Sequence, residues 1–231
     1  MNIKDLKPAN DFAQNFGCKC LIFGPAGTGK TPLLNTAPRP LLLATEPGLL
    51  SMRGSNIPTY EAYTPAKIDE FFKWFFNSNE TKNFDTLGID SASQIADIYL
   101  IDAQKNNKHG LKAYGEMAES TMEHLRTLYY TRYKHTYVVC KEEIKDLDGQ
   151  SMRRPYFPGQ VLPISVPHLY DFILRLAKTN VPGVQGETLA FQCQGSYNVL
   201  SRNRTGNLSQ YEPPNFSQLV EKAMTAPPMV Y

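Results

Sequence analysis

Residues 24–31 carry the most specific chemical pattern in the chain. They read Gly-Pro-Ala-Gly-Thr-Gly-Lys-Thr and satisfy G-x-x-x-x-G-K-[ST] at every defined position. In such a loop, glycines let backbone N–H groups turn toward phosphate oxygens, the lysine reaches the β- and γ-phosphates, and the hydroxyl ligates Mg²⁺. We therefore predict that Lys30 is catalytic and that Thr31 is a metal ligand; an ordinary glycine turn is the alternative. The predicted ATP-binding residues are Gly24, Pro25, Ala26, Gly27, Thr28, Gly29, Lys30, Thr31 and Pro32.

Two acidic residues stand where buried strands are expected to end. Glu46 follows the apolar run 41–45, and Asp90 follows the run 86–89. Ligands bind at the carboxyl ends of strands in α/β sheets, so we expect both carboxylates near the phosphates. Asp90 suits a Mg²⁺ ligand acting through water, and Glu46 suits a catalytic group that polarises the water attacking the γ-phosphate. The alternatives are a helix cap for Asp90 and an exposed loop position for Glu46.

The elements that must position these groups alternate between strands and helices, which predicts an α/β fold with a mostly parallel central sheet. A buried strand over 19–23 precedes the glycine-rich loop, and a short helix follows it. Asp148-Gly149 is a hairpin-turn signal, so 141–157 is expected to form a β-hairpin that projects from the sheet. Further strands are expected at 41–45, 60–63, 86–89, 135–140, 188–194 and 197–200, the last two antiparallel. Further helices are expected from Pro65 onward and over 92–104, 114–133, 167–178 and 215–224.

Length and composition set limits on the class of protein. The 231 residues suit one domain, with 1–17 as a lead-in and 207–231 as a C-terminal helix and tail. A net charge of +2 requires any nucleic-acid binding to come from local basic groups. No apolar run approaches about 18 residues, and the N-terminus lacks the apolar stretch of a secretory signal. We read the four cysteines as reduced core residues and expect a cytoplasmic protein without membrane contact.

Five segments together give the chain a resemblance to a known family. The sequence resembles the RecA-like ATPases, and more closely the small phage-encoded RecA-like ATPases regarded as single-strand annealing proteins. The resemblance implies a RecA-like fold, ATP hydrolysis with Glu46 as the catalytic glutamate and Asp90 as the Walker B acid, and, for a phage protein, the cytoplasm of the host bacterium. The segments are GPAGTGKT, LLLATEPG, TLGIDSAS, YFPGQVLPISVPHLYDFILRL and SRNRTGNLSQYEPPNF.

The pattern Arg202-x-Arg204-x-Gly206 is similar to the K-x-R-x-G element of RecA-like hexameric helicases. In those proteins the basic pair reaches the γ-phosphate of a neighbouring subunit. The resemblance therefore implies that Arg202 and Arg204 are catalytic in trans, within a homo-oligomeric ring or filament. Arginine stands where the family has lysine, and two solvated arginines in a hairpin turn are the alternative.

RecA-like proteins bind single strands through loops after the Walker B helix and after the next strand. Basic side chains there track phosphates, and aromatic side chains stack on bases. A solvated charged face with a packed aromatic pair is the alternative. The corresponding DNA-binding candidates in this chain are Lys105, Lys108, Lys112, Arg153, Arg154, Tyr156 and Phe157.

These observations together predict an ATP-dependent, oligomeric protein that binds single-stranded DNA and promotes annealing or recombination in phage DNA metabolism. Its cofactors would be ATP and Mg²⁺. A P-loop small-molecule kinase and a nucleotide-switched assembly factor without DNA contact are the alternatives. Stimulation of ATP hydrolysis by single-stranded DNA would separate the three.

Overall fold

A central sheet organises the computed structural model, which describes residues 2–9, 11, 15–107, 109–147 and 149–225. Within these residues the sheet has nine strands, in the order β11-β9-β8-β1-β5-β4-β2-β3, with β10 paired to β8. The strands are β1 (Lys19–Phe23), β2 (Pro40–Ala44), β3 (Thr59–Glu61), β4 (Thr86–Asp90), β5 (His135–Val139), β8 (Phe172–Asn180), β9 (Glu187–Gln192), β10 (Arg202–Asn203) and β11 (Tyr211–Glu212).

The middle of the sheet is parallel and its late strands are antiparallel. β1 lies between β5 and β8, parallel to both, and β5 continues through β4 and β2 to β3 in the same direction. β9 and β10 are antiparallel to β8, and β11 is antiparallel to β9. Every residue of β1 is buried, as expected for a strand covered on both faces. The predicted fold class, a mostly parallel α/β sheet with late antiparallel strands, is confirmed.

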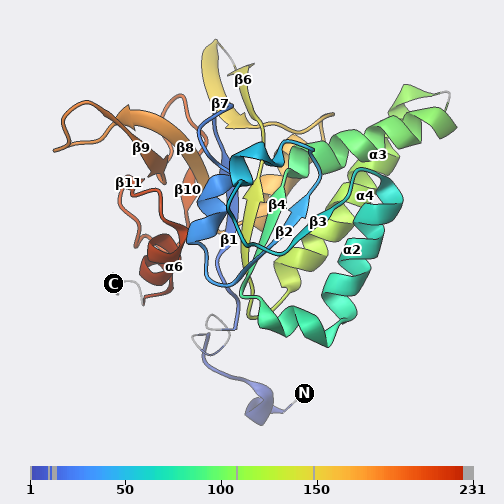
Figure 1. The fold of residues 1–231 in the computed structure, drawn as a ribbon, viewed down its shortest axis with the longest axis horizontal. Helices are drawn as coiled ribbons and strands as arrows, with labels where there is room; N and C mark the ends of the chain where they lie inside the picture. The colour runs from blue at the N-terminus through green and yellow to red at the C-terminus, as the bar shows by residue number, and fades with distance from the viewer. Residues whose placement is uncertain (1, 10, 12–14, 108, 148, 226–231) are drawn as a thin grey trace.

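Helices cover both faces of this sheet and enclose two hydrophobic clusters (Figure 1). One face packs against α2 (Pro65–Asn77), α3 (Ala92–Asn106) and α4 (Gly110–Tyr130). The other packs against η2 (Pro32–Thr36) and α6 (Phe216–Met224). The helix expected from Pro65 onward is confirmed as α2, and its apolar residues at helical spacing are all buried: Ile68, Phe71, Phe72 and Phe75. The remaining short helices are η1 (Ile3–Asp5), η3 (Leu49–Met52), η4 (Asn79–Asn83), α5 (Leu162–Ser165) and η5 (Val166–Leu169).

A separate β-hairpin rises from the carboxyl end of β5. Its strands, β6 (Glu142–Leu147) and β7 (Gln150–Pro155), pair antiparallel and form a two-stranded sheet of their own. Figure 1 shows the hairpin projecting beyond the main sheet. Gly149 has φ +81°, the left-handed conformation that the turn signal predicts. The prediction of a projecting hairpin is confirmed; Asp148 itself lies outside the described residues.

Two predicted elements are wrong. The segment 167–178 is not a helix, because β8 occupies most of it and lies parallel to β1. Residues 172–174 are buried, and a short, fully buried apolar run has no periodicity that separates strand from helix. The strand expected at 197–200 is also absent, since Val199 makes isolated bridges there and β10 begins later, at Arg202.

Candidate nucleotide-binding site

The glycine-rich loop lies between β1 and η2, as predicted. Gly24 follows the last residue of β1, and a Cβ at this position would lie 2.1 Å from the carbonyl oxygen of Leu176 on β8. Gly27 and Gly29 have φ of +76° and +81°. The first glycine therefore allows the loop to leave the sheet against β8, and the other two allow it to curl back on itself.

The curled loop leaves its amide groups available to a ligand. Within the part of the chain that the structure describes, the backbone N–H groups of residues 26–31 donate to no protein acceptor. Lys30 Nζ donates to the carbonyl oxygens of Gly24, at 2.7 Å, and of Pro25, at 2.8 Å. A row of free amides beside an ammonium group is a binding site for the phosphates of a nucleotide.

The element after the loop is shorter than a phosphate-binding helix usually is. Pro32 opens η2, a 3₁₀ helix of five residues, with Thr31 as its N-cap. The expected short helix is thus a 3₁₀ turn, which contributes little macrodipole to phosphate binding. We therefore expect phosphate binding to depend on the charge of Lys30 and on the loop amides.

The two predicted metal ligands meet. Thr31 Oγ1 donates to Asp90 Oδ2 at 2.5 Å, which brings the loop to the end of β4. Burial, and next the charge of Glu46, raise the pKa of Asp90, while the bond from Thr31 and the charge of Lys30 oppose this rise. No cluster of three or more His, Cys, Asp or Glu side chains suited to a metal occurs in the described residues. One hydroxyl and one carboxylate fit Mg²⁺ that is held mainly by nucleotide phosphates and water.

Asp90 does not cap the helix that follows it. Ser91 is the N-cap of α3, and its hydroxyl accepts a hydrogen bond from the backbone N–H of Gln94 at 3.2 Å. The alternative reading of Asp90 as a helix cap is therefore excluded. Its carboxylate points instead toward Thr31.

Glu46 lies beyond the end of β2, close to the Asp90 strand. Its Oε1 accepts a hydrogen bond from Ser91 Oγ at 2.7 Å and lies 4.0 Å from Lys141 Nζ. The Glu46 side chain is 38% exposed, so water reaches it. A carboxylate oriented by a hydroxyl, next to the predicted metal ligand Asp90 and accessible to water, has the surroundings that a general base needs.

Three charged residues near the loop were missed by sequence reasoning. Lys141 donates to Gln94 at 2.8 Å and to Asp97 at 3.1 Å. Glu142 accepts two hydrogen bonds from Arg175 of β8. Lys141 and Glu142 follow β5, so the strand-end rule applied to that strand would have found them. Arg175 was not predicted as a site residue, because its segment was incorrectly predicted to be a helix.

The two arginines predicted to act in trans lie at the opposite end of the sheet from the phosphate loop. β10 pairs with the beginning of β8, at Phe172 and Ile173, whereas the loop follows the end of β1. Arg202 Nη2 donates to the backbone carbonyl oxygens of Pro167 and Tyr170. The arginine pair therefore does not reach its own subunit's loop, and Arg202 is engaged in holding the fold.

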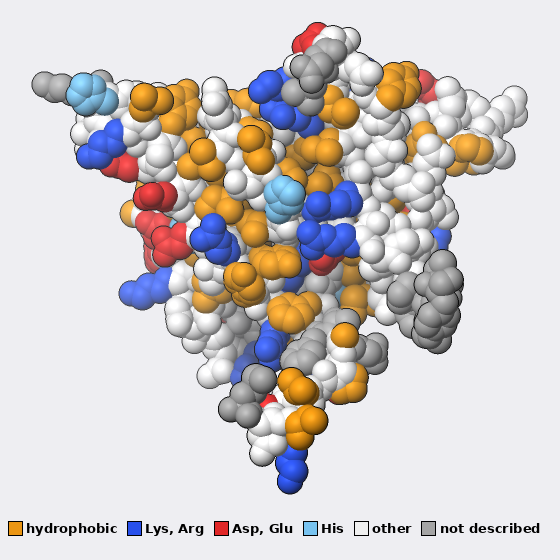
Figure 2. Space-filling model, turned by 180° about the vertical axis from the view of Figure 1, so that it is seen from behind, with side chains coloured by type: hydrophobic (Ala, Val, Ile, Leu, Met, Phe, Trp, Pro, Cys, Tyr) orange, Lys and Arg blue, Asp and Glu red, His pale blue; other side chains and the backbone are white. Residues whose placement is uncertain are grey.

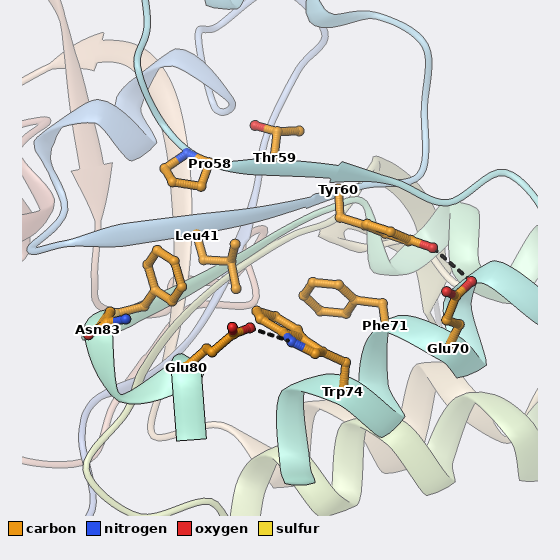
Figure 3. A pocket seen from close by; sticks show the side chains of 10 residues that line it. Leu41, Pro58, Thr59, Tyr60, Glu70, Phe71, Trp74, Glu80 and Asn83 are labelled. Atoms are coloured by element: carbon orange, nitrogen blue, oxygen red, sulfur yellow. Dashed lines mark hydrogen bonds between the residues drawn. The ribbon is translucent and has the colours of Figure 1, made fainter. Parts of the chain in front are cut away.

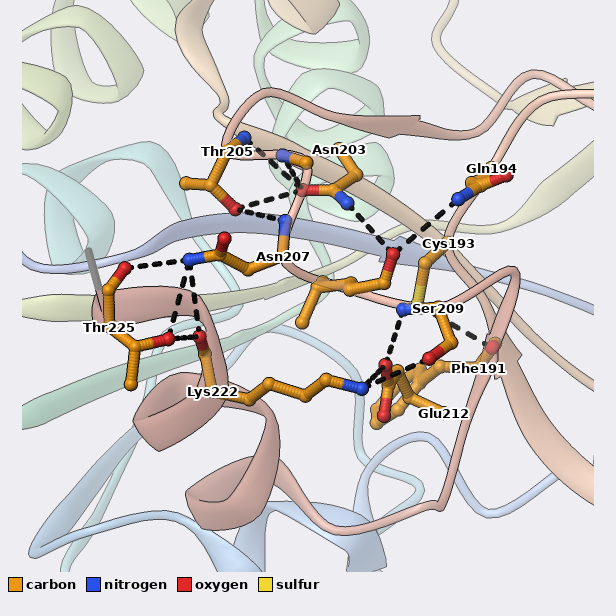
Figure 4. A network of polar contacts seen from close by, with 12 residues as sticks. Phe191, Cys193, Gln194, Asn203, Thr205, Asn207, Ser209, Glu212, Lys222 and Thr225 are labelled. Atoms are coloured by element: carbon orange, nitrogen blue, oxygen red, sulfur yellow. Dashed lines mark hydrogen bonds and ion pairs between the residues drawn. The ribbon is translucent and has the colours of Figure 1, made fainter. Parts of the chain in front are cut away.

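Arg204 is the more available of the two. Its guanidinium donates to Asp171 Oδ1 and to the carbonyl oxygen of His168, both at 3.1 Å, and its side chain is 39% exposed. Asn203 Oδ1 accepts from the backbone N–H groups of Thr205 and Gly206, which fixes the turn after Arg204 (Figure 4). A role of Arg204 toward a neighbouring subunit stays a prediction.

The hairpin residues predicted to bind DNA have different surroundings. Arg153 and Tyr156 are half-buried, and within the described residues the Arg153 guanidinium has no hydrogen-bond or ion-pair partner. Arg154 Nε donates to Glu143 Oε1 at 2.7 Å, and its side chain is 13% exposed. Phe157 is 2% exposed within the main hydrophobic cluster. The prediction that Phe157 binds DNA is therefore wrong, because a buried ring cannot stack on a base.

Two of the three lysines predicted after the Walker B helix lie on the helices α3 and α4. Lys105 and Lys112 are exposed, with Asp102 at 4.0 Å from the first and Glu116 at 3.7 Å from the second. Lys108 lies outside the described residues. Exposed pairs of this kind leave both ammonium groups free to meet other anions.

A separate hollow of about 570 Å³ lies at the edge strand β3, against α2 (Figure 3). Tyr60 donates to Glu70 at 2.9 Å, and Trp74 donates to Glu80 at 3.2 Å, across its wall. None of the predicted ATP-binding residues lines it. We therefore place the nucleotide at the glycine-rich loop rather than in this hollow.

A glycine-rich loop at the end of a parallel strand, with two strand-end carboxylates beside it, has the arrangement of a P-loop nucleotide-binding site. Residues 17–205 match the family model AAA_24, an AAA domain, and the chain belongs to this family. The resemblance to P-loop ATPases is thereby confirmed, while the likeness to phage annealing proteins stays a prediction. No curated protein matches the chain significantly.

Among solved structures, the chain is similar to a KaiC-like protein of the archaeon Pyrococcus horikoshii, with 14% identity, 76% of each chain covered and a TM-score of 0.41. It is also similar to the flagellar accessory protein FlaH of Methanocaldococcus jannaschii. That match has 13% identity, covers 85% of this chain and 84% of the other, and has a TM-score of 0.40. Within the described residues, no helix has the length and apolar character to cross a membrane. All four cysteines are buried and free, as predicted.

Proposed function

We propose that this protein hydrolyses ATP and binds single-stranded DNA through its β-hairpin, as an oligomer that promotes annealing or recombination of phage DNA. The observation that carries the proposal is where the hairpin begins. β6 starts at Glu142, within a few residues of the end of β5, and Lys141 before it lies 4.0 Å from Glu46. A projecting hairpin anchored beside the water-activating carboxylate is suited to link the two ligands.

The nucleotide chemistry divides among four side chains. Lys30 and the loop amides would bind the β- and γ-phosphates, and Thr31 and Asp90 would hold Mg²⁺, which would neutralise charge on the phosphates. Glu46 orients a water molecule toward the γ-phosphate and accepts its proton. The Ser91 hydroxyl, 2.7 Å from Glu46, holds that carboxylate in place.

DNA binding would depend on a few local cations. On the face that Figure 2 shows, Lys and Arg side chains lie in small groups among apolar and neutral ones. On the hairpin, Arg153 and the exposed Lys145, which sequence reasoning left out, are the available cations. Tyr156 supplies a half-buried ring at the hairpin base for stacking. Lys105 and Lys112 form a second candidate group, on α3 and α4.

Oligomerisation would complete the ATPase site. The loop, Glu46 and Asp90 lie together on one subunit, while Arg204 lies on a fixed turn at the other end of the sheet. A head-to-tail arrangement would bring Arg204 of one subunit to the γ-phosphate bound by the next. A cation supplied in this way stabilises charge in the transition state.

Salt-dependent binding of a fluorescent single-stranded oligonucleotide tests the DNA part. Arg153→Ala should weaken binding and flatten the salt dependence by about one unit of slope for the lost phosphate contact. Tyr156→Ala should weaken binding by about 1–3 kcal/mol with little change in slope. Arg53→Ala removes an exposed arginine between β2 and β3 and is the matched control.

The outcomes separate the candidate sites and functions. Unchanged affinity in both hairpin variants would move the site to Lys105 and Lys112. Absence of any DNA binding by the parent protein would favour an assembly factor or a small-molecule kinase instead.

A further inference from the structure

An ion pair connects the strand next to the phosphate loop with the root of the hairpin. Arg175 of β8 donates from Nε to Glu142 Oε2 at 2.6 Å and from Nη2 to Oε1 at 3.3 Å. The two side chains are 14% and 11% exposed. A two-bond contact between a guanidinium and a carboxylate, largely shielded from water, is among the stronger polar contacts in a protein.

This pair lies beside the phosphate loop. Arg175 is in register with Phe23, the last residue of β1, and Leu176 touches Gly24, where the loop begins. The charge of Glu142 also acts on the loop lysine: burial lowers the pKa of Lys30, and the charges of Asp90 and Glu142 partly oppose that lowering. Arg175 and Glu142 are therefore close to the place where Lys30 would meet the terminal phosphate.

A terminal phosphate would act on the two partners in opposite ways. It carries negative charge, so it repels the Glu142 carboxylate and attracts the Arg175 guanidinium. Arginine binds phosphate with the same forked geometry that it uses for carboxylate. ADP lacks the γ-phosphate, so it offers Arg175 no terminal phosphate in exchange for Glu142 and leaves the ion pair intact.

We infer that Arg175 distinguishes ATP from ADP by exchanging its partner, from Glu142 to the γ-phosphate, and thereby frees the Glu142 end of β6 from β8. The inference rests on the proposed binding of ATP at this loop. Glu142 is the first residue of β6, so the ion pair ties the hairpin to β8. The contact between Arg154 and Glu143 lies within the hairpin and keeps its two strands together when that tie is lost.

The exchange makes opposite predictions for the two partners. Arg175→Gln removes the group that binds the γ-phosphate and should weaken binding of a non-hydrolysable ATP analogue about tenfold or more. Glu142→Gln removes the competing, repelling carboxylate and should tighten binding of the same analogue several-fold. ADP affinity should change by less than about twofold in both. A purely structural ion pair would give changes of the same sign for both substitutions and both nucleotides.

Calorimetric titration with the ATP analogue and with ADP measures these ratios on the full chain. Arg39→Gln is the matched control, because Arg39 makes a similar two-bond contact with Asp85 at 2.6 and 2.5 Å. That pair precedes β2 and β4, at the end of the sheet away from the loop. Thermal unfolding of each variant identifies any that fail to fold, and Arg175→Lys, which keeps the charge, should retain part of the preference for ATP.

Limited trypsin digestion follows the hairpin directly. In the parent protein the ATP analogue should speed cleavage within residues 142–155, and ADP should not. Glu142→Gln should be cleaved at the faster rate without nucleotide. Two results would refute the exchange of partners without refuting ATP binding. One is a folded Arg175→Gln variant whose ratio of ATP to ADP affinity equals that of the parent protein. The other is weaker ATP binding by Glu142→Gln. A parent protein that binds neither nucleotide overturns both the exchange and the proposed function.

Discussion

Replacing Glu46 with glutamine separates binding of ATP from its hydrolysis. The amide has nearly the same shape as the carboxylate. Its oxygen can still accept the hydrogen bond from Ser91 Oγ, which lies 2.7 Å from Glu46 Oε1 in the parent protein. The side chain is 38% exposed and 4.0 Å from Lys141, so losing its charge changes ground-state energies by less than about 1 kcal/mol. Nucleotide affinity should therefore stay within about fivefold of the parent protein.

The rate of hydrolysis should fall much further. A positioned general base contributes about 10²–10⁴ in rate, which corresponds to about 3–5 kcal/mol in the barrier. Single-turnover hydrolysis of radiolabelled ATP measures the chemical step, and a separate titration measures the affinity. Glu187→Gln, an exposed carboxylate at the start of β9, is the control for loss of one charge.

Ser91→Ala gives a graded comparison. It removes the hydroxyl that orients Glu46 and also the N-cap of α3, so it should slow hydrolysis less than Glu46→Gln and lower stability by about 0.5–2 kcal/mol. Hydrolysis by Glu46→Gln within about threefold of the parent rate would refute the assignment. Asp97, which contacts Lys141, would then be tested next. Asp85 is less suited, because it is paired with Arg39 just before β4 begins.

Three further predictions address the loop, the buried charge and the subunit interface. Lys30→Ala should lose tight ATP binding while keeping its fold; near-parental affinity by titration would contradict the phosphate-loop assignment. Burial lowers the pKa of Lys19 from its ordinary 10.5 to about 8, so between these values the unfolded chain holds a proton that the folded chain has lost. The free energy of unfolding should therefore rise with pH across that window, by up to about 3 kcal/mol relative to Lys19→Met, as measured by urea titration. A difference in unfolding free energy between the two proteins that does not change with pH would contradict this prediction. Arg204→Ala should bind ATP normally yet hydrolyse it poorly, and mixing it with Glu46→Gln should restore some hydrolysis. If the two variants co-assemble and no mixing ratio restores hydrolysis, Arg204 does not act in trans.

Much of the site could be predicted because its signals are local. The loop motif, the strand before it and the acidic residues after two apolar runs are each set by a few neighbouring residues. The same holds for the hairpin turn at Gly149 and for the apolar stripe of α2. The structure brings Thr31, Asp90 and Glu46 together because the parallel strands end at one edge of the sheet.

The rest depended on tertiary contacts that local patterns do not encode. Residues 172–176 form a strand because β1 and the late strands flank them, although their apolar run also suits a helix. Because a helix was predicted there, Arg175 was not recognised as a residue near a strand end. Phe157 follows basic residues as an exposed stacking residue would, yet the main cluster encloses it. Arg202 belongs to a motif seen in catalytic elements, but its guanidinium binds carbonyl groups of the preceding segment.

Comparing ATP hydrolysis with and without single-stranded DNA shows whether the protein is a DNA-stimulated ATPase. We expect Mg²⁺-dependent hydrolysis that single-stranded oligonucleotides accelerate, that Lys30→Ala abolishes, and that Arg153→Ala uncouples from DNA while leaving the basal rate intact. Hydrolysis that is unaffected by any single-stranded DNA, at oligonucleotide concentrations well above the protein concentration and at low salt, would contradict it.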